Sequence, residues 1–422
     1  MSMNMENIAV DCDVAIVGAG PSGSIAGAML ANKGYSVHII EKQYFPRFSI
    51  GESLLPQCMQ FVEEAGMLDA VNEAADRLGF QFKNGAAFVR GDSYTDFDFR
   101  QKFSEGPGTT FQVQRAMFDN LIAEEAHKKG VQISWGHELT SLDNSGEYPV
   151  IHAKDAEGDA YQLSARFVLD ASGFGRVLPR LLKLEKPSSF PSRTSLFTHI
   201  QDNIDASEFD RDKIRITIHP EHKDVWFWLI PFSNGRCSLG VVAESEFYEG
   251  LPEDPKRRLQ TIVEQDPNLR NLLRNAEFDT PVNQITGYSA DVSSLWGKGF
   301  ALLGNAGEFL DPVFSSGVTI AMKSASLAVK CLDRQLQGEL VDWEEDYALP
   351  LRAGVDTFRT FVTAWYDGRF QDIIFAKNQS TEIREMISSI LAGYAWDDKN
   401  PYVKESERRM NTLAEICRVQ SA

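Results

Sequence analysis

The chain has 422 residues, which is long enough for two or three domains or for one large discontinuous domain with a sizeable core. Hydrophobic residues make up 43% and charged residues 24%, the composition of an ordinary globular protein. The formal net charge of −18 repels phosphate backbones and anionic lipids, so nucleic acid and a membrane surface are not expected as partners.

The sequence gives little indication of a signal peptide, a membrane span or a metal site. No basic region followed by an apolar stretch opens the chain, and no segment reaches the ~18 apolar residues of a membrane span, so neither a signal peptide nor stable membrane insertion is expected. The five cysteines form no CxxC pair, which favours a reducing compartment. His219 and His222 lie in a polar loop and are predicted at the surface, not as metal ligands. We therefore expect a cytoplasmic protein without a metal site.

A nucleotide-binding fingerprint occupies the first forty residues. A short apolar strand over 12–17 runs into GAGPSG at 18–23, a helix is predicted over 24–33, and a second strand follows over 36–40. In this context the glycines let backbone N–H groups and the helix N-terminus approach a pyrophosphate. Glu41 lies 18 residues after Gly23, where a carboxylate accepts from a ribose hydroxyl. The pattern predicts a bound adenine dinucleotide; the alternative is a tight turn without a ligand.

The segments that follow are not those of a plain NAD domain. Residues 45–56 read FPRFSIGESLLP in place of the next helix, and 111–121 are typical of a strand entering a helix. The stretch 167–172 (FVLDAS) predicts a strand that ends at Asp170 and a glycine turn. No second GxGxxG follows a strand, so a dedicated NAD(P)H domain is not expected.

The stretch VWFWLIPF at 225–232 is apolar on both faces. In a strand, Trp226, Trp228 and Ile230 would point one way and the residues between them the other. Pro231 would end the ladder because it has no N–H to donate. A buried strand with a packing role alone is one interpretation, and a wall of tryptophans beside a ligand is the other.

The last third of the chain contains one more strand–glycine turn and then helices. A strand over 300–303 leads into GNAG at 304–307, and a helix is predicted over roughly 317–336. Residues 341–422 have the apolar spacing of helices and no motif that indicates a chemistry.

Together these motifs resemble the flavin-dependent halogenases, within the FAD-dependent oxidoreductases that are similar to aromatic hydroxylases. WFWLIP at 226–231 matches that family's WxWxIP, and residues 309–317 match its FxxPxxSxG. The segment FQFKNGAAF at 80–88 resembles the one that carries the lysine of the phenol and pyrrole members, and FPRxxIGESLLP is also similar to theirs. Asn305 departs from the family, which has an Asp there; an amide still accepts from a sugar hydroxyl but lacks the charge.

The resemblance implies FAD as the cofactor, held by the fingerprint and by residues further along the chain. The residues that we expect to bind it are Gly18, Gly20, Pro21, Ser22, Gly23, Glu41, Lys42, Arg47, Ser49, Ile50, Gly51, Glu52, Arg115, Asp170, Ala171, Ser172, Gly173, Gly304, Asn305, Pro312, Ser316, Gly317 and Val318.

Lys83 is the lysine that the resemblance singles out for catalysis. Its apolar neighbours predict a desolvated amine with a lowered pKa. The resemblance implies that hypohalous acid halogenates this amine, which passes the halogen to an electron-rich ring carbon. The alternative is a lysine whose stem covers apolar surface while its charge reaches water.

The resemblance also gives the tryptophans and the second motif a role. Trp226 and Trp228 would wall the flavin from the organic substrate. Ser316 and Gly317 open a helix, whose free N–H groups suit a halide ion or the pyrimidine oxygens of the flavin. These residues and Lys83 are the predicted catalytic set.

The predicted fold class is α/β, a three-layer ββα Rossmann-like FAD-binding domain with an antiparallel-sheet substrate domain and C-terminal helices. The FAD-binding domain is expected over 1–185, with a small sheet insert near 81–104, and again over 283–340. The substrate domain is expected over 186–282 and the helical region over 341–422.

Three functions fit this sequence. The first is a two-component halogenase that takes reduced FAD from a separate flavin reductase, with dioxygen and a halide ion, and acts on a small-molecule or carrier-tethered aromatic substrate. The second is a FAD-dependent monooxygenase or a dehydrogenase/reductase on the same fold. The third is a flavoprotein whose main role is to dock a carrier protein.

Overall fold

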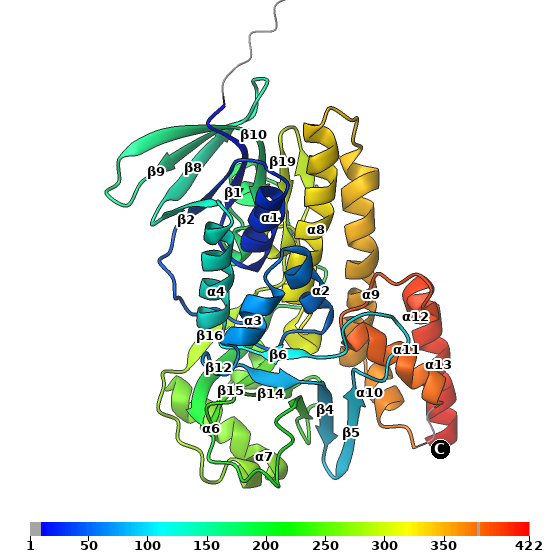
Figure 1. Cartoon of the computed structure of the whole chain (residues 1–422). Helices are drawn as coiled ribbons and strands as arrows, with labels where there is room; N and C mark the ends of the chain where they lie inside the picture. Colours follow the sequence, from blue (N-terminus) through cyan, green and yellow to red (C-terminus); the bar gives the residue numbers. More distant parts are fainter. Residues whose placement is uncertain (1–9, 378–379, 422) are drawn as a thin grey trace, which may run out of the picture.

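The computed structural model describes residues 10–377 and 380–421, which form two large sheets, two small two-stranded sheets and a helical C-terminal region (Figure 1). The first sheet has the strand order β18-β19-β10-β1-β2-β7. At its centre, β1 (Cys12–Val17) lies between β10 (Ala160–Asp170) and β2 (Val37–Glu41), and both run parallel to it. The outer strands are β7 (Gln132–Trp135), β19 (Phe300–Leu302) and the edge strand β18 (Trp296–Gly297).

Helices α1 (Pro21–Asn32), α4 (Arg115–Lys128) and α8 (Gly317–Leu336) pack beside one another on this sheet (Figure 1). Strand β9 (Val150–Lys154) pairs antiparallel with β10, and β8 (Glu138–Asp143) pairs antiparallel with β9, so these two strands extend the first sheet. The predicted α/β class with a parallel FAD-type sheet is confirmed. The first helix begins three residues earlier than predicted, because Pro21 at its first turn has the φ of a helix and no N–H to leave unsatisfied.

Three strand ends meet at one edge of the first sheet, and this positions the site. The register pairs Val17 with Asp170 and Asp170 with Leu302, so β1, β10 and β19 end side by side. Each of these strands continues into a glycine-containing turn. Ligands of open α/β sheets bind at the carboxyl ends of the strands, where such turns present backbone N–H groups.

The second sheet has the order β16-β12-β15-β14-β13-β4-β5 and is antiparallel except for the parallel pair β13–β4. Strand β16 pairs with β12, so the second sheet extends past residue 282 into the segment expected to belong to the FAD-binding domain. The expected insert near 81–104 supplies the other edge of this sheet. The strands are β4 (Gly85–Arg90), β5 (Ser93–Asp98), β12 (Arg193–Gln201), β13 (Lys213–Ile218), β14 (Trp226–Pro231), β15 (Arg236–Glu244) and β16 (Asn283–Thr286).

The two faces of β14 belong to different cores, as the period of two predicts. Phe227 and Leu229 pack in a small core with α6 (Pro255–Gln265) and α7 (Pro267–Leu272). Trp226, Trp228 and Ile230 face the main core, on the side of the first sheet. Both tryptophans therefore share a face.

The C-terminal helices pack beside α8 and reach the end of the second sheet that carries β4 and β5 (Figure 1). Trp365 of α9, for example, contacts the Phe88 ring of β4 at 5.9 Å between centroids. None of the helices in the described part of the chain is long and apolar enough to cross a membrane. The helices of this region are the π-helical turn Glu344–Ala348, α9 (Leu349–Tyr366), α10 (Arg369–Ile374), α11 (Thr381–Leu391), α12 (Pro401–Lys404) and α13 (Ser406–Ser421).

Short elements connect the two sheets. Strand β3 carries Lys83 and pairs with β6 in a small two-stranded sheet. The short elements are α2 (Gln57–Glu64), α3 (Leu68–Ala74), β3 (Gln81–Lys83), β6 (Thr110–Gln112), α5 (Val177–Leu181), β11 (Glu185–Lys186) and β17 (Asp291–Val292).

The prediction of a surface position for His219 is wrong. Its side chain is buried, with Nε2 2.9 Å from Oε1 of Gln265 and the ring stacked on Phe227. It fills the small core because α6 covers the loop that the sequence indicated as polar. Residues 10–377 and 380–421 contain no group of three His, Cys, Asp or Glu side chains that could hold a metal ion.

Candidate active site

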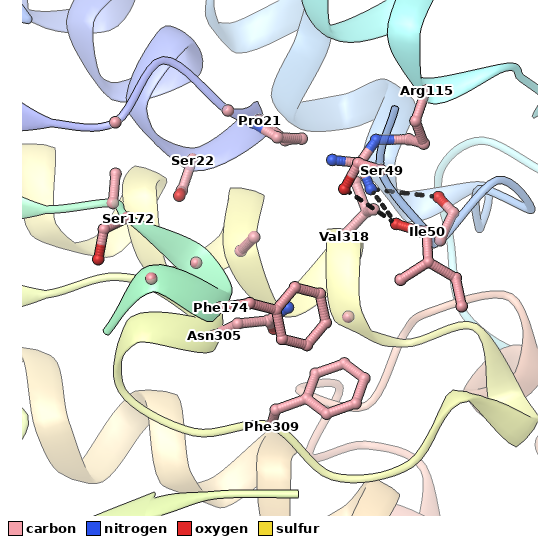
Figure 2. A pocket seen from close by; sticks show the side chains of 18 of the residues that line it. Pro21, Ser22, Ser49, Ile50, Arg115, Ser172, Phe174, Asn305, Phe309 and Val318 are labelled. Carbon is pink, nitrogen blue, oxygen red and sulfur yellow. Dashed lines mark hydrogen bonds between the residues drawn. The ribbon is translucent and has the colours of Figure 1, made fainter. Parts of the chain in front are cut away.

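A cavity of about 850 Å³ extends from the glycine turns of the first sheet to the tryptophan face of the second sheet. Most of the residues expected to bind the cofactor line it, and Figure 2 shows several of them around the opening. The expected residues that line it are Gly18, Gly20, Pro21, Ser22, Glu41, Lys42, Arg47, Ser49, Ile50, Gly51, Glu52, Arg115, Ala171, Ser172, Gly173, Asn305, Pro312, Gly317 and Val318, together with Trp226 and Trp228.

The three glycines of the fingerprint serve two different purposes. A Cβ at Gly18, which has φ +99°, would lie 2.7 Å from the Ala171 carbonyl oxygen, and one at Gly23 would lie 2.0 Å from the Gly18 oxygen. These two glycines are required by packing within the protein. A Cβ at Gly20 would meet only Nη2 of Arg47, at 3.7 Å, so its missing side chain leaves room toward the cavity. Of the three glycines, Gly20 is therefore the one where a bound ligand, and not packing within the protein, accounts for the missing side chain.

Four expected cofactor residues do not line the cavity: Gly23, Asp170, Gly304 and Ser316. Gly23 is a packing glycine. The Asp170 carboxylate is fully buried and accepts the N–H groups of Ser172 and Leu178, at 2.8 and 2.7 Å, so it shapes the turn. A Cβ at Gly304 would lie 2.8 Å from Cα of Ala321, so this glycine lets α8 approach. Ser316 is buried at the start of α8.

Glu41 and two arginines bring charge to the cavity. The Glu41 carboxylate accepts the N–H groups of Ala19 and Gln43, at 2.7 and 2.8 Å, which fixes it at the end of β2. Arg115 and Arg47 both donate to Asp119, a residue that sequence reasoning missed. Asp119 lies four residues after Arg115 on a predicted helix, and this spacing could have indicated the ion pair.

Arg115 also ties the cavity wall to the FPRFSIGES stretch. Its Nη1 donates to the Ile50 carbonyl oxygen at 2.6 Å (Figure 2). Gly51 has φ +96°, and a Cβ there would lie 3.1 Å from the same guanidinium. The stretch is therefore held against α4 by contacts of the Arg115 guanidinium with its backbone.

Asn305 and the start of α8 provide the remaining polar groups. The Asn305 Oδ1 is buried and has no hydrogen-bond partner among the described residues. The helix that begins at Gly317 has no side-chain cap, and Gly317 and Val318 line the cavity. An unpartnered acceptor fits a sugar hydroxyl, and free N–H groups at a helix start fit electronegative oxygens. With the room at Gly20 and the Glu41 carboxylate, these residues fit FAD.

The tryptophan wall lies at the other end of the cavity. Trp226 and Trp228 are almost fully buried, with ring centroids 5.9 Å apart. Trp228 Nε1 donates to the Ser238 hydroxyl at 3.1 Å. A Cβ at Gly240, across the ladder on β15, would lie 2.2 Å from the Trp228 ring, so this glycine makes space for the indole.

Lys83 is fully buried at the end of β3, but it does not line the cavity. Its Nζ donates to the Ser53 hydroxyl at 2.8 Å and to the Leu54 carbonyl oxygen at 2.7 Å. Burial lowers the pKa of this ammonium to about 7, and proximity to Cys58 opposes the shift. Ser53 lines the cavity and stands between it and the amine, a role that sequence reasoning missed although Ser53 is part of the IGES segment.

The comparisons with known proteins show the family and the fold of the chain. The FAD binding domain family matches residues 11–344. A 1H-pyrrole-2-carbonyl-(peptidyl-carrier protein) brominase of Pseudoalteromonas luteoviolacea is 30% identical over 341 residues, or 79% of this chain and 80% of that protein. The corresponding chlorinase of Pseudomonas fluorescens is 28% identical over 431 residues, or 96% of this chain and 94% of that protein. The crystal structure of a flavoprotein/dehydrogenase from Cytophaga hutchinsonii is 43% identical and has a TM-score of 0.93, covering 97% of this chain and 100% of the other.

The fold and the site define a FAD-dependent oxidoreductase. The family model spans most of the chain, and the brominase aligns over most of both proteins. The chain belongs to the FAD-binding flavoprotein family that contains the flavin-dependent halogenases, and it is a halogenase-like member.

Proposed function

We propose that the protein is a two-component flavin-dependent halogenase. It would take reduced FAD from a separate flavin reductase and use dioxygen and a halide ion to halogenate an electron-rich aromatic group. The observation that carries the proposal is Lys83, a fully buried amine whose two hydrogen-bond acceptors, Ser53 and Leu54, are both neutral. Buried lysines are rare unless they are paired, so one without a carboxylate partner indicates a chemical role.

When bound, FAD would supply the activation of dioxygen that turns the halide into hypohalous acid. Gly18, Gly20 and the start of α1 would hold its pyrophosphate, Glu41 a ribose hydroxyl, and Asn305 a further hydroxyl. The first turn of α8, at Gly317, would hold the halide or the flavin's own oxygens. Trp226 and Trp228 would keep the organic substrate and bulk water from the flavin end of the cavity.

Lys83 would carry the halogen from the cavity to the substrate. In the first step the neutral amine attacks hypohalous acid, an N–halogen bond forms, and water leaves. In the second step an aromatic carbon takes the halogen, its proton is lost, and the amine is regenerated. A pKa of about 7 leaves roughly half of the amine neutral at neutral pH, and only the neutral form is a nucleophile. The hypohalous acid would approach the amine from the side of Ser53, which lines the cavity.

The aromatic substrate is proposed to be an acyl group on a carrier protein, with a free small aromatic molecule as the other possibility. The relatives from Pseudoalteromonas luteoviolacea and Pseudomonas fluorescens bear names that describe carrier-bound pyrrole substrates, which supports the first choice. A pyrrolyl carrier protein that gains the mass of one bromine in place of hydrogen would support it. Bromination of free aromatics alone would favour the second.

The test of the reaction uses the protein with a flavin reductase, NADH, FAD, dioxygen and bromide, and a chemical trap for hypobromous acid. Hypobromous acid should accumulate in the absence of an organic substrate, and it should require both bromide and the reductase. A protein that consumes reduced FAD and releases only hydrogen peroxide at every bromide concentration would contradict the proposal.

Two observations favour a monooxygenase or a dehydrogenase instead. Lys83 is closed off from the cavity by Ser53, and the structure with 43% identity is named a flavoprotein/dehydrogenase. A lysine that only packs would leave the cavity to one organic substrate and the flavin. Rapid oxidation of NADH or NADPH without a reductase, or a hydroxylated or desaturated product, would support this second function.

A further inference from the structure

The two tryptophans of the wall are bonded to different kinds of partner. Trp228 donates its indole N–H to Ser238, which does not titrate. Trp226 donates its indole N–H to the hydroxyl of Tyr366 on α9, at 2.9 Å. That hydroxyl donates in turn to Oδ2 of Asp311, at 3.0 Å. Two hydrogen bonds therefore connect the wall of the cavity to a buried carboxyl group.

Asp311 lies just before Pro312 and is 2% exposed. Its Oδ1 accepts the N–H of Val313 at 3.1 Å, which fixes the carboxyl at the turn that leads to α8. The charged and titratable groups around it are Arg193 on β12, Tyr366 on α9 and Tyr288 between β16 and β17. Burial raises the pKa of Asp311 to about 6, while the Arg193 charge and the hydrogen bonds lower it.

Arg193 does not neutralise Asp311 fully, because it has other partners. Its guanidinium donates to Glu244 on β15 at 3.2 Å and lies 3.4 Å from the centroid of the Tyr366 ring. A carboxyl group in this setting can hold a proton at mildly acidic to neutral pH.

Tyr288 connects this carboxyl group to the cavity. Tyr288 lines the cavity, and its buried hydroxyl lies near the Ser195 hydroxyl and the Asp311 carboxyl group. Burial raises the pKa of Tyr288 well above its usual value, and the nearby Asp311 charge raises it further. A tyrosine hydroxyl can both accept and donate a proton, so one that lies near a buried carboxyl group and lines the cavity can pass a proton from the first to the second.

We propose that Asp311 stores a proton for the cavity and delivers it through the Tyr288 hydroxyl, while Tyr366 and Trp226 hold the carboxyl group in place. The O–H bond of Asp311 breaks as its proton passes to the Tyr288 oxygen, and the Tyr288 O–H breaks as its proton passes to an oxygen in the cavity. Asp311 is left as a carboxylate, the acceptor gains one proton, and nothing is oxidised or reduced in this step.

The inference rests on the proposed function, because halide oxidation needs such a proton. In the overall reaction, reduced FAD, dioxygen, one halide ion and one proton give FAD, hypohalous acid and water. The tryptophan wall would keep bulk water from the flavin end of the cavity, so a buried group would have to supply this proton.

The first test is a pH titration of the indole N–H signals of the full-length protein with FAD, labelled with ¹⁵N-tryptophan. Trp226→Phe and Trp228→Phe assign the two signals. The Trp226 signal should shift with a midpoint near pH 6 and lose this shift in Asp311→Asn, whereas the Trp228 signal should stay constant. A Trp226 signal that is constant from about pH 5 to 8, or that still shifts in Asp311→Asn, would overturn the proposal.

The second test is the release of hypobromous acid as a function of pH. Only protonated Asp311 can donate, so wild-type release should fall as pH rises through the pKa of this group. Asp311→Asn and Tyr288→Phe should lower release by about 100-fold below that pH, remove the pH dependence, and leave FAD affinity unchanged. Unchanged release in Tyr288→Phe would overturn the delivery route. A wild-type protein without any release would contradict the halogenase proposal alone, because the indole titration needs no turnover.

Discussion

The two ends of the cavity are built in different ways. At the FAD end, the shape is set by backbone: glycine turns after β1, β10 and β19, and the first turns of α1 and α8. At the tryptophan end, it is set by side chains that come from separate segments, such as Trp226, Tyr288 and Ser53. Backbone-built sites depend on local sterics and charge, whereas side-chain-built sites depend on packing between distant segments. Substitutions should therefore act differently at the two ends.

The largest effect is expected at Gly20. Gly20→Val should lower FAD affinity by about 100-fold or more, because the side chain would fill the room that the pyrophosphate needs. The melting temperature of the FAD-free protein should stay the same, since little protein lies near this position. Fluorescence titration with FAD and thermal unfolding measure the two quantities.

Gly23→Ala is the matched control for that prediction. Its Cβ would clash with the Gly18 carbonyl oxygen, so it should lower the melting temperature even without FAD. Wild-type FAD affinity in Gly20→Val would mean that the pyrophosphate binds elsewhere.

At the other end, Lys83→Met should raise the stability of the protein by about 1–4 kcal/mol at pH 6, the range for replacing buried charges with apolar side chains. The folded pKa of about 7 lies below the ordinary lysine value of 10.5, so folding carries the full cost of burying the charge below pH 7. That cost decreases as pH rises from 7 toward 10.5, and the advantage of methionine should decrease with it. Urea unfolding at pH 6 and pH 9 measures this; an advantage that is larger at pH 9 would contradict it.

A smaller effect is expected when the wall is opened. Trp228→Ala should increase the fraction of reduced FAD lost as hydrogen peroxide by about threefold, because water would enter the space of the indole. Gly240→Ala should act in the same direction, since its Cβ would displace the Trp228 ring. Peroxide assays under turnover measure the loss, and unchanged peroxide in both variants would show that the wall does not exclude water.

The smallest effect is expected at Asn305. Asn305→Asp should leave FAD affinity within about threefold of wild type, or tighten it, because a carboxylate accepts from a sugar hydroxyl at least as well as an amide. Titration with FAD decides the matter. Weakening beyond about tenfold would mean that Asn305 faces a negative group such as the pyrophosphate.

Sequence reasoning was most successful where structure depends on local pattern. The strand–glycine–helix fingerprint, the shared face of Trp226 and Trp228, and the helix over 317–336 were all predicted, because each follows from sterics or a period of two or 3.6 residues. The buried amine with a lowered pKa at Lys83 was also predicted, from its apolar neighbours and a family resemblance.

The remaining features depend on long-range contacts. The Ser53 hydroxyl lies next to the Lys83 amine because β3 pairs with β6 beside the IGES segment. Asp311 meets Trp226 only through Tyr366, more than fifty residues away in sequence. The close packing around Gly23 and Gly304 could not be predicted, because a motif does not distinguish a glycine needed for packing from one needed by a ligand.

The most direct measurement of the central claim is product formation by Lys83→Ala, with Lys83→Arg beside it. Both variants should bind FAD and release hypobromous acid like the wild type, yet lose brominated product. Alanine has no amine, and a guanidinium stays protonated and cannot take the halogen. Bromination of an established aromatic substrate at near wild-type rate by Lys83→Ala would contradict the halogenase mechanism.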